Sequence, residues 1–577
     1  MKCFALFILV LFSFSLYAQI ATLDSVPLQL QLFQRGADDS ACLPIVGAVT
    51  AVGYDSLIVE ITRNGTPFKR IATALSYSAG SARFSLHPAI HAELAEYTLR
   101  LFADADSVYR ADSVVCGDAY LITGQSNAVS NDYDDSVSFQ FEYVRSFRRG
   151  ANIGWGLARA DSMYLDYSVG VWGLWLGKTV TDSQGVPAAI INGALGSTEI
   201  ESHLRYGPSP YNTYHLYGAL MTRARNAWFQ ERVRAIFWHQ GESDALSMAL
   251  GAAYAGKFDS LYRSWKEDYP ALQRIYVYQT HPGSSCGNYG HPVREAQRAF
   301  QETYPDVRVM TTADVRNHDG GCHYHYYGYR EFARRMYDLL KHDFTSSIDT
   351  VGVSPPNIQH AYFTNSNRDE VALVFDQPVV WKADTFTVWN TTITYYRMKN
   401  YFYLEDTTAM GINDEVDSGY AVPTENKIIL KLSRPTTATK ITYLPHSSYI
   451  AGPWLRNGRG IGALTFYRFP VDTSSTITES IIGLDNPGVI RLSVSPNPAN
   501  PRFRIFTSGL SATAAIFSKL RLDVIDAAGR RVADMALSPA ELRCGVVWDA
   551  GRLPSGVYIV RLTIGNRKYE TRAVLLK

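Results

Sequence analysis

Short runs in which apolar and polar residues alternate fill the first part of this 577-residue chain. Over residues 19–115 the alternation is clear at Tyr97, Leu99 and Leu101, and turn pairs such as Asn64-Gly65 separate the runs. A period of two is typical of strands with one buried face, and such turns connect antiparallel neighbours. We therefore predict an N-terminal β-sandwich domain over residues 19–115.

Between residues 116 and 345 the pattern changes to apolar runs that alternate with long segments of helical periodicity. The runs expected to be strands are Ala119–Thr123, Pro187–Asn192, Ala235–His239, Arg274–Thr280 and Val307–Thr312. The segments with helical periodicity are Tyr214–Glu231, Met248–Tyr269, Pro292–Tyr304 and Tyr329–His342. This order predicts a three-layer α/β/α domain, in which helices cover both faces of a parallel sheet. Ligands of such sheets bind beyond the carboxyl ends of the strands.

Strand-like patterns return after the helical region. Runs such as Val371–Phe375 predict a second β-sandwich domain over residues 346–472. Threonine and serine are frequent in residues 473–491, which we interpret as a linker, and residues 492–577 again contain short strands separated by turn residues. A multidomain chain agrees with the length, because one hydrophobic core rarely grows beyond about 250–300 residues.

Residues 1–18 have the layout of a secretory signal peptide. Lys2 precedes an apolar run from Phe4 to Leu16, and the small residue Ala18 follows. No later apolar run reaches the roughly 20 residues needed to span a bilayer, so we expect a secreted or surface-held protein. Fifty-five basic and 54 acidic residues give a net charge of +1, which provides no field for binding nucleic acid.

Four polar segments directly follow predicted strands: Gly124–Asn127, Asn192–Ser197, His239–Asp244 and Asp319–His323. A serine hydroxyl becomes a useful nucleophile when a base takes its proton, and a strand-to-helix turn would hold Ser126 exposed in the crevice. Imidazole titrates near neutral pH, so His323 is the expected base. His325 is the alternative base.

Acyl transfer also needs donors for the oxyanion of the tetrahedral intermediate. The backbone N–H groups of Ser126 and Gly196 can approach an oxyanion closely, because little side chain stands in the way at Gly196. The side-chain amide of Gln240 is the expected third donor. We expect His239 to pack beneath the crevice.

The segments resemble a known family. Gly124-Gln-Ser-Asn127, Trp238-His-Gln-Gly-Glu-Ser243, Arg294-Glu-Ala-Gln297 and Cys322-His-Tyr before Gly328-Tyr are similar to the sialate O-acetylesterase and acetylxylan esterase branch of the SGNH hydrolases. The resemblance covers about residues 115–342 and implies a flavodoxin-like parallel sheet. It also implies that Ser126 is the nucleophile, that His323 is the base, and that Gly196 and Gln240 share the oxyanion hole with the Ser126 amide.

One position departs from the family pattern. The family's orienting acid usually stands three residues before the histidine, where this chain has Gly320. Asp319 stands one residue earlier, and the extra glycine would let the chain loop this carboxylate back to the imidazole. Glu242 in the third segment is the competing candidate for the orienting carboxylate.

Three further residues are predicted to contact substrate: Asn127, Arg294 and Gln297. The alternative for Arg294 and Gln297 is that they fix loops at the start of a helix. A zinc site formed by His318, Asp319, His323 and His325 is a rival interpretation. It leaves Ser126 without a role, so we expect neither a metal ion nor an organic cofactor.

The mature chain would contain five cysteines, an odd number for an oxidising environment: Cys42, Cys116, Cys286, Cys322 and Cys544. We favour a bridge between Cys286 and Cys322, because both lie in loops near the predicted site. Two free buried thiols are the alternative.

The C-terminal residues have a resemblance of their own. Ser495-Pro-Asn-Pro498, the segment Leu522–Arg530, Trp548 and Ser555-Gly-Val-Tyr558 are similar to the C-terminal sorting domain of the type IX secretion system. This resemblance implies that the secretion machinery is a partner, that the protein is exported across an outer membrane and that the tail is then removed. It also implies a Bacteroidetes-like Gram-negative source.

The sequence thus predicts a secreted carbohydrate O-acetylesterase that works through an acetyl-serine intermediate. The alternatives are an SGNH esterase of broader specificity and a catalytically impaired carbohydrate-binding surface protein. Both O-acetylated sialic acid and acetylated polysaccharide are candidate substrates, because both activities occur in the resembling branch.

Overall fold

The computed structural model describes residues 20–131, 140–150, 153–160, 164–282, 287–320, 322–345, 351–389, 392–404, 415–445, 452–473, 491–495, 502–508, 520–536, 546–564 and 567–575. The chain divides into two compact units, Met1–Thr473 and Ser474–Lys577. The signal peptide predicted for residues 1–18 and two of the cysteines, Cys286 and Cys544, lie outside the described residues.

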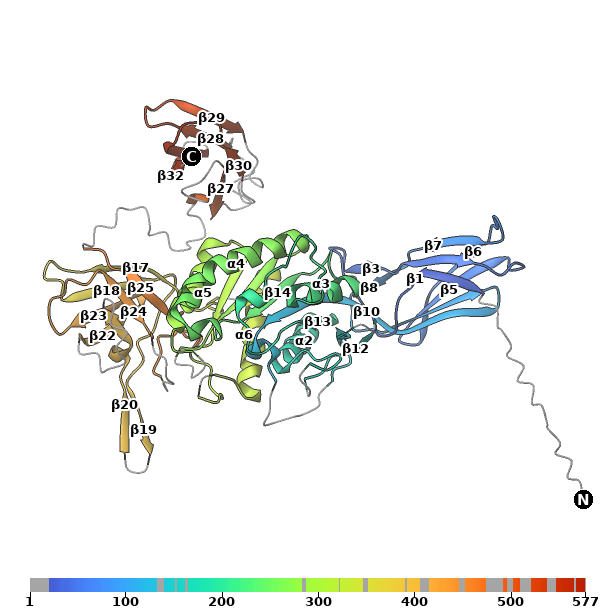
Figure 1. Cartoon of the computed structure of the whole chain (residues 1–577), viewed down its shortest axis with the longest axis horizontal. Helices are drawn as coiled ribbons and strands as arrows, with labels where there is room; N and C mark the ends of the chain where they lie inside the picture. Colours follow the sequence, from blue (N-terminus) through green and yellow to red (C-terminus); the bar gives the residue numbers. More distant parts are fainter. Residues whose placement is uncertain are drawn as a thin grey trace, which may run out of the picture. The chain divides into compact units, whose positions relative to one another are not determined.

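Antiparallel strands form the N-terminal part of the first unit, drawn in blue in Figure 1. One sheet has the order β1-β4-β7 and another joins β6, β5, β9 and the start of β10. The predicted alternation is present: Leu57, Val59 and Ile61 of β5 are buried and enter one apolar core with Ile45 and Phe84 of the other sheet. The bounds are β1 Ala21–Ser25, β2 Leu32–Gln34, β3 Ser40–Cys42, β4 Ile45–Val49, β5 Ser56–Arg63, β6 Thr66–Ala74, β7 Ala82–Leu86, β8 Ala89–His91 and β9 Tyr97–Ala103.

Strand β10, Asp106–Gly124, connects these strands to the central sheet. Its first half pairs antiparallel with β9, and residues from Asp118 onward pair in parallel with β13 and β14. The register shifts between Ala111 and Val114, and parallel pairing begins at Val115, which lies opposite Leu32 of β2. The predicted boundary between residues 115 and 116 therefore falls inside one uninterrupted strand.

The central sheet is mixed, with the order β12-β11-β13-β10-β14-β15-β16. All five predicted strands are present, and their pairings are parallel. The expectation of a wholly parallel sheet is corrected at one edge, because the short strand β12 runs antiparallel to β11. The bounds are β11 Val144–Phe147, β12 Trp155–Leu157, β13 Ala188–Asn192, β14 Ala235–His239, β15 Arg274–Gln279 and β16 Val307–Thr311.

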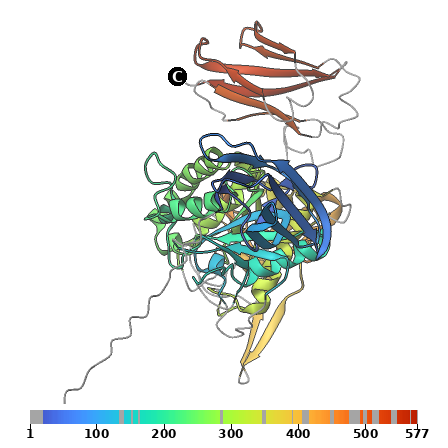
Figure 2. The same cartoon turned by 90° about the vertical axis from the view of Figure 1, so that its right-hand side faces the viewer.

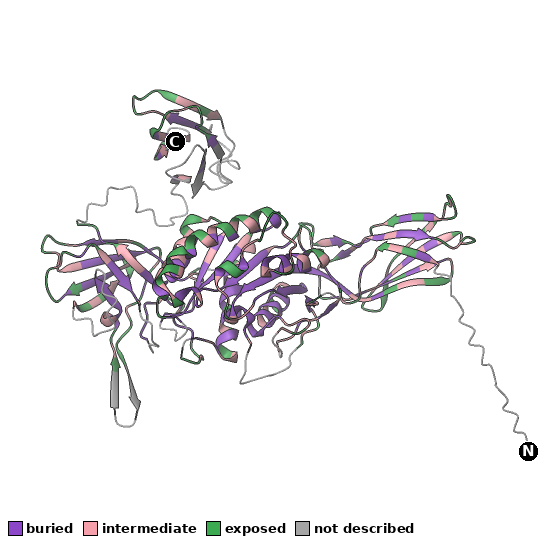
Figure 3. Ribbon diagram, in the orientation of Figure 1, coloured by how far each residue is buried: buried purple, intermediate pink, exposed green. Residues whose placement is uncertain are grey.

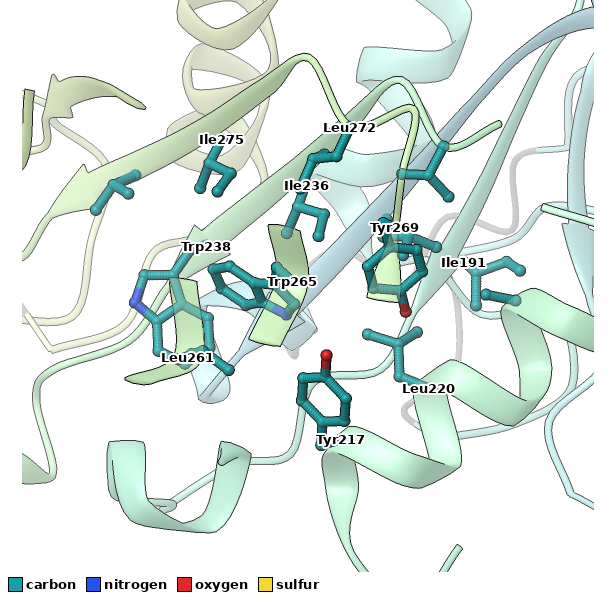
Figure 4. Close-up of a cluster of buried hydrophobic side chains, with 14 of the residues drawn as sticks. Ile191, Tyr217, Leu220, Ile236, Trp238, Leu261, Trp265, Tyr269, Leu272 and Ile275 are labelled. Atoms are coloured by element: carbon teal, nitrogen blue, oxygen red, sulfur yellow. The ribbon is translucent and has the colours of Figure 1, made fainter. Parts of the chain in front are cut away.

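Helices cover both faces of this sheet. On one face α3, α4 and α5 share an apolar cluster with Ile191, Ile236 and Trp238, and Figure 4 shows Leu220 and Trp265 against these strand residues. On the other face α2 and α6 share a cluster with strand residues such as Phe237. The strands between the helices are buried along their length (Figure 3). The bounds are α2 Val171–Gln184, α3 Leu216–Asn226, α4 Met248–Asp268, α5 Gly290–Thr303 and α6 Tyr326–Phe344.

Several small antiparallel sheets complete the first unit. The order β17-β18-β23-β22 forms one sheet, β21-β24-β25 a second and the β19-β20 pair a third. The first two share a core that includes Leu373, Leu430 and Tyr443. The bounds are β17 Ile358–Phe363, β18 Glu370–Phe375, β19 Thr385–Trp389, β20 Thr392–Tyr396, η3 Met398–Tyr401, β21 Phe402–Leu404, β22 Val416–Val422, η4 Pro423–Glu425, β23 Lys427–Leu432, β24 Lys440–Tyr443 and β25 Phe466–Pro470.

The second unit consists of antiparallel strands, drawn in red in Figure 2. The orders are β26-β27-β30 and β29-β28-β31-β32, and Leu522, Trp548 and Val560 lie in their common core. The bounds are β26 Arg491–Ser495, β27 Arg502–Ser508, β28 Leu520–Ile525, β29 Arg531–Ala536, β30 Val546–Asp549, β31 Gly556–Ile564 and β32 Arg567–Leu575. Across the described residues of both units, none of the helices is long and apolar enough to cross a membrane.

Candidate active site

Ser126 lies where β10 turns into a helix. The strand ends at Gly124, and the one-turn helix α1 spans Ser126–Val129. Gly124 has a φ of +135°, and a Cβ there would lie 2.1 Å from the carbonyl oxygen of His239 on β14. Only glycine fits this close approach of two backbones, which sets Ser126 at the carboxyl end of the sheet.

His323 reaches Ser126 from the segment before α6. Its Nε2 lies 3.0 Å from Ser126 Oγ, within hydrogen-bonding reach of a nucleophile and its base. The two residues are 197 positions apart in the chain. They meet because α1 and the segment before α6 both lie at the carboxyl ends of parallel strands.

Asp319 lies beside the same imidazole. Its Oδ2 is 3.5 Å from His323 Nδ1, and its Oδ1 accepts a hydrogen bond of 2.6 Å from the His323 backbone N–H. The turn between them is closed by a hydrogen bond from Asp319 N–H to the His323 carbonyl, and Gly320 adopts a φ of +74° within it. A carboxylate four residues before the histidine thus reaches the ring nitrogen that faces away from the serine.

Glu242, the other candidate acid, is buried and has different partners. Its Oε1 accepts a hydrogen bond of 2.7 Å from Asn127 Nδ2 and lies 3.4 Å from His239 Nε2. Burial on its own would raise the pKa of Glu242, but the neighbouring His239 imidazole and the hydrogen bond from Asn127 outweigh burial and lower the pKa. The structure places this carboxylate beneath the site, against His239 and Asn127.

The predicted oxyanion donors fall into two groups. Ser126 begins α1, so its N–H is among the amides that have no acceptor within the helix. Gly196 N–H faces the same space and donates a hydrogen bond of 2.8 Å to Tyr164 Oη. Gln240 forms the second group: its side chain is fully buried, and Nε2 donates to the carbonyl of Thr198 and the carboxylate of Asp244.

A cavity of about 260 Å³ opens at Ser126. We call it the Ser126 cavity, and its lining residues are Ser126, Val129, Asn131, Tyr164, Gly196, Ser197, His323 and Tyr329. Tyr329 belongs to the Gly328-Tyr pair of the motif, so the sequence contained a signal for it. The sequence contained no such signal for Tyr164, which lies in an irregular loop and has a φ of +62°. The Arg149 guanidinium lies 5.0 Å from the centre of its ring.

The three residues predicted to contact substrate do not line this cavity. Asn127 is buried behind Ser126. Arg294 is also buried, and its Nη2 donates to the carbonyl of Leu444. Gln297 is fully buried and bonds the backbone of Thr280 and of Gln240. Their polar groups are used in packing loops together, as in the alternative role expected for Arg294 and Gln297.

Three of the cysteines lie in the described part of the chain. Cys322 is disulfide-bonded, and Cys286, its predicted partner, lies outside the described residues. Cys42 and Cys116 are free, and burial raises the pKa of the Cys116 thiol to about 12. Within the described part of the chain, no three His, Cys, Asp or Glu side chains gather as a metal-binding group.

Two parts of the chain match the models of known protein families. Residues 116–341 match the family model of carbohydrate esterases described as sialic acid-specific acetylesterase. Residues 493–576 match that of the secretion system C-terminal sorting domain. No curated protein matches the chain.

Solved structures of carbohydrate esterases are similar to this chain at low identity. A carbohydrate acetylesterase from Xanthomonas citri is 17% identical with a TM-score of 0.51, and the match covers 78% of this chain and 99% of the other. An acetyl xylan esterase from the rumen bacterium Butyrivibrio proteoclasticus is 11% identical with a TM-score of 0.25, and the match covers 54% of this chain and 97% of the other. The first likeness shows a shared fold.

The two family matches identify two separate domains of the chain. A sorting domain of this kind indicates secretion or display at the cell surface through its secretion machinery. Residues 116–341 therefore form a domain of the sialic acid-specific acetylesterase family of carbohydrate esterases, a family of ester hydrolases, and residues 493–576 form a C-terminal sorting domain of the type IX secretion system.

Proposed function

We propose that the protein is a secreted carbohydrate O-acetylesterase that transfers the acetyl group to Ser126 and then to water. The observation that carries the proposal is the 3.0 Å contact between Ser126 Oγ and His323 Nε2 at the wall of the Ser126 cavity. It lies inside the domain that matches the acetylesterase family.

In the first step His323 Nε2 takes the Ser126 hydroxyl proton as Oγ attacks the acetyl carbonyl carbon. The carbonyl oxygen becomes an oxyanion, for which the N–H groups of Ser126 and Gly196 are the proposed donors. The Gly196 N–H must exchange its bond to Tyr164 Oη for one to the substrate. The intermediate collapses, the bond to the sugar oxygen breaks, and His323 returns the proton to that oxygen.

In the second step a water molecule replaces the sugar. His323 takes a proton from this water as it attacks the acetyl-Ser126 carbonyl. When the intermediate collapses, the bond to Ser126 Oγ breaks, His323 returns the proton to Oγ, and acetate is released. The carboxylate of Asp319 faces Nδ1, so it would hold the imidazole in orientation and stabilise its protonated form in both steps. Asp319 is therefore our proposed orienting acid, in preference to Glu242.

We also propose a finer description of the fold. The sheet order β13-β10-β14-β15-β16 follows the 2-1-3-4-5 pattern of flavodoxin-like folds, which supports an SGNH-type three-layer domain over residues 116–345. The shared cores of the flanking sheets support β-sandwich domains over residues 19–115 and 346–472. Residues 473–491 are the proposed linker to the sorting domain, and residues 1–18 the proposed signal peptide.

The test of the proposal is acetate release by the purified protein. A chromogenic acetate ester establishes esterase activity, and O-acetylated sialic acid and acetylated xylan then identify the sugar class. We expect turnover of the chromogenic ester and of at least one of the two carbohydrates. Binding of the carbohydrates without acetate release would instead identify an impaired, carbohydrate-binding protein.

A further inference from the structure

Asn127, the residue after the proposed nucleophile, connects the two segments that carry Ser126 and His323. Its side chain is only 2% exposed. Nδ2 donates one hydrogen bond of 2.9 Å to the carbonyl of Cys322, the residue before His323, and another of 2.7 Å to Glu242 Oε1. Both N–H bonds of the amide are therefore used inside the protein.

Glu242 determines which way the Asn127 amide points. An ionised carboxylate only accepts hydrogen bonds, so it requires the NH₂ group of Asn127 to face it. The same NH₂ group then reaches the Cys322 carbonyl, while Asn127 Oδ1 accepts a bond of 3.1 Å from Tyr329 Oη. The lowered pKa keeps Glu242 ionised near neutral pH.

The two proposed catalytic side chains on the His323 segment are partly exposed. The side chains of His323 and Asp319 are 42% and 45% exposed. By contrast, Asn127 and Glu242 are buried, and Trp172 Nε1 fixes the Asn127 carbonyl at 2.9 Å. One hydrogen bond of Asn127 Nδ2 thus joins the Ser126 segment to the Cys322 carbonyl, and the other, to Glu242, holds the amide in that direction.

We propose that Asn127 and Glu242 are positioning residues that set the distance between Ser126 Oγ and His323 Nε2 by tying the turn at Ser126 to the Cys322 carbonyl. We call this unit the Asn127–Glu242 bridge: the side chains of Asn127 and Glu242 and the carbonyl of Cys322. The inference rests on the proposed pairing of serine and histidine. It assigns Glu242 a role other than orienting the His323 imidazole. It also assigns Asn127 a role other than contact with the substrate.

The experiment measures the rate at which a fluorophosphonate probe labels Ser126, together with kcat and KM on a chromogenic acetate ester. Labelling depends on serine activation by histidine and on no particular acyl substrate, so it tests the bridge even if acetate esters are not turned over. Asn127→Ala should lower the labelling rate and kcat by roughly 10- to 100-fold, because a displacement of about 1 Å at a reacting group costs up to about 100-fold. KM should change by less than about twofold, because Asn127 does not line the cavity.

The Glu242 variants separate positioning from acid catalysis. Glu242→Gln keeps a carbonyl oxygen for Asn127 Nδ2, so it should retain most of the labelling rate. Glu242→Ala removes the acceptor and should resemble Asn127→Ala. Because the two residues act as one unit, the double alanine variant should be little worse than either single variant. Equal, large losses in Glu242→Gln and Glu242→Ala would overturn the proposal in favour of a carboxylate that orients the imidazole.

Asn457→Ala is the matched control. Asn457 is also buried, and its Nδ2 donates to the carbonyls of Gly352 and Ser354 in another part of the unit. This variant should lose thermal stability and keep the wild-type labelling rate. The bridge is refuted if folded Asn127→Ala labels as fast as wild type, or if its KM rises while kcat is unchanged. A wild-type protein that fails to label would contradict the serine–histidine pair itself, and the bridge with it.

Discussion

Asp319 contacts His323 twice, through the backbone N–H at 2.6 Å and near the ring Nδ1 at 3.5 Å. Asparagine at this position would keep an oxygen for the backbone bond and lose the negative charge beside the ring. We expect Asp319→Asn to fold normally and to lower kcat by about 10²- to 10⁴-fold, as loss of the orienting carboxylate does in serine hydrolases. Steady-state turnover of one acetate ester measures this.

A suitable control for that variant is Asp104→Asn. Asp104 also accepts backbone N–H bonds through its carboxylate, from Asp55 and Ser56, and it lies among the N-terminal strands. It should leave turnover unchanged. Wild-type kcat in Asp319→Asn would remove Asp319 from the mechanism.

Gly196 gives a steric test of the proposed oxyanion hole. A Cβ added there would lie 3.8 Å from Ser126 Cβ and 3.2 Å from Tyr164 Oη, with no backbone atom in closer contact. Gly196→Ala should therefore keep its unfolding temperature close to wild type while the methyl group narrows the Ser126 cavity. We expect kcat/KM to fall by about 10-fold or more, because the methyl group crowds the oxyanion; full loss of one oxyanion donor costs about 10²- to 10³-fold. An unchanged kcat/KM would place the oxyanion elsewhere.

His203 makes the stability of the esterase domain depend on pH. Burial lowers its pKa from 6.5 to about 3, and its Nε2 lies 2.8 Å from Thr198 Oγ1. Between pH 6.5 and 3, His203 therefore binds a proton in the unfolded state but not in the folded state. The free energy of unfolding is thus highest above pH 6.5 and decreases as the pH falls through this range. We expect the unfolding temperature of wild type to fall more steeply from pH 7 to pH 5 than that of His203→Gln, which does not titrate. Parallel curves would contradict this prediction.

We expect residues 492–577 to act as a sorting signal and to take no part in catalysis. The contact of Ser126 with His323 and the Ser126 cavity both lie within the first compact unit, which ends at Thr473. A chain shortened by residues 492–577 should keep kcat and KM on an acetate ester and should not be delivered to the surface of the native host. Folded but inactive truncated protein would show that the tail contributes to the site.

The sequence predicted the parts of the site that depend on strand ends. Ser126 and Gly196 follow adjacent parallel strands, β10 and β13, so their meeting at one edge follows from the alternation of strands and helices. Helix α2 was missed because its first turns, with Val171, Trp172 and Leu174, are apolar on most sides and buried, which hides the helical period.

The contacts that individual side chains make were harder to predict from the sequence than the positions of the segments that carry them. Gln297 and Arg294 have residue types equally suited to substrate contact and to fixing loops, and only the packing of α5 against neighbouring loops decides between them. Tyr164 reaches Gly196 from a loop whose backbone conformation no periodic pattern encodes. The predicted domain boundary at residue 115 lies within β10, because the pairing partners change along this strand while the strand itself continues.

The central claim is that acetyl transfer passes through Ser126. The most direct measurement mixes the protein with an acetate ester, quenches the reaction with acid within its first turnovers, and locates the acetyl group by peptide mass spectrometry. We predict an acetylated peptide containing Ser126 in wild type, and in Ser126→Ala no acetylated peptide and a loss of turnover of about 10³-fold or more. Turnover by Ser126→Ala at the wild-type rate, or acetylation of a different residue in wild type, would contradict the account.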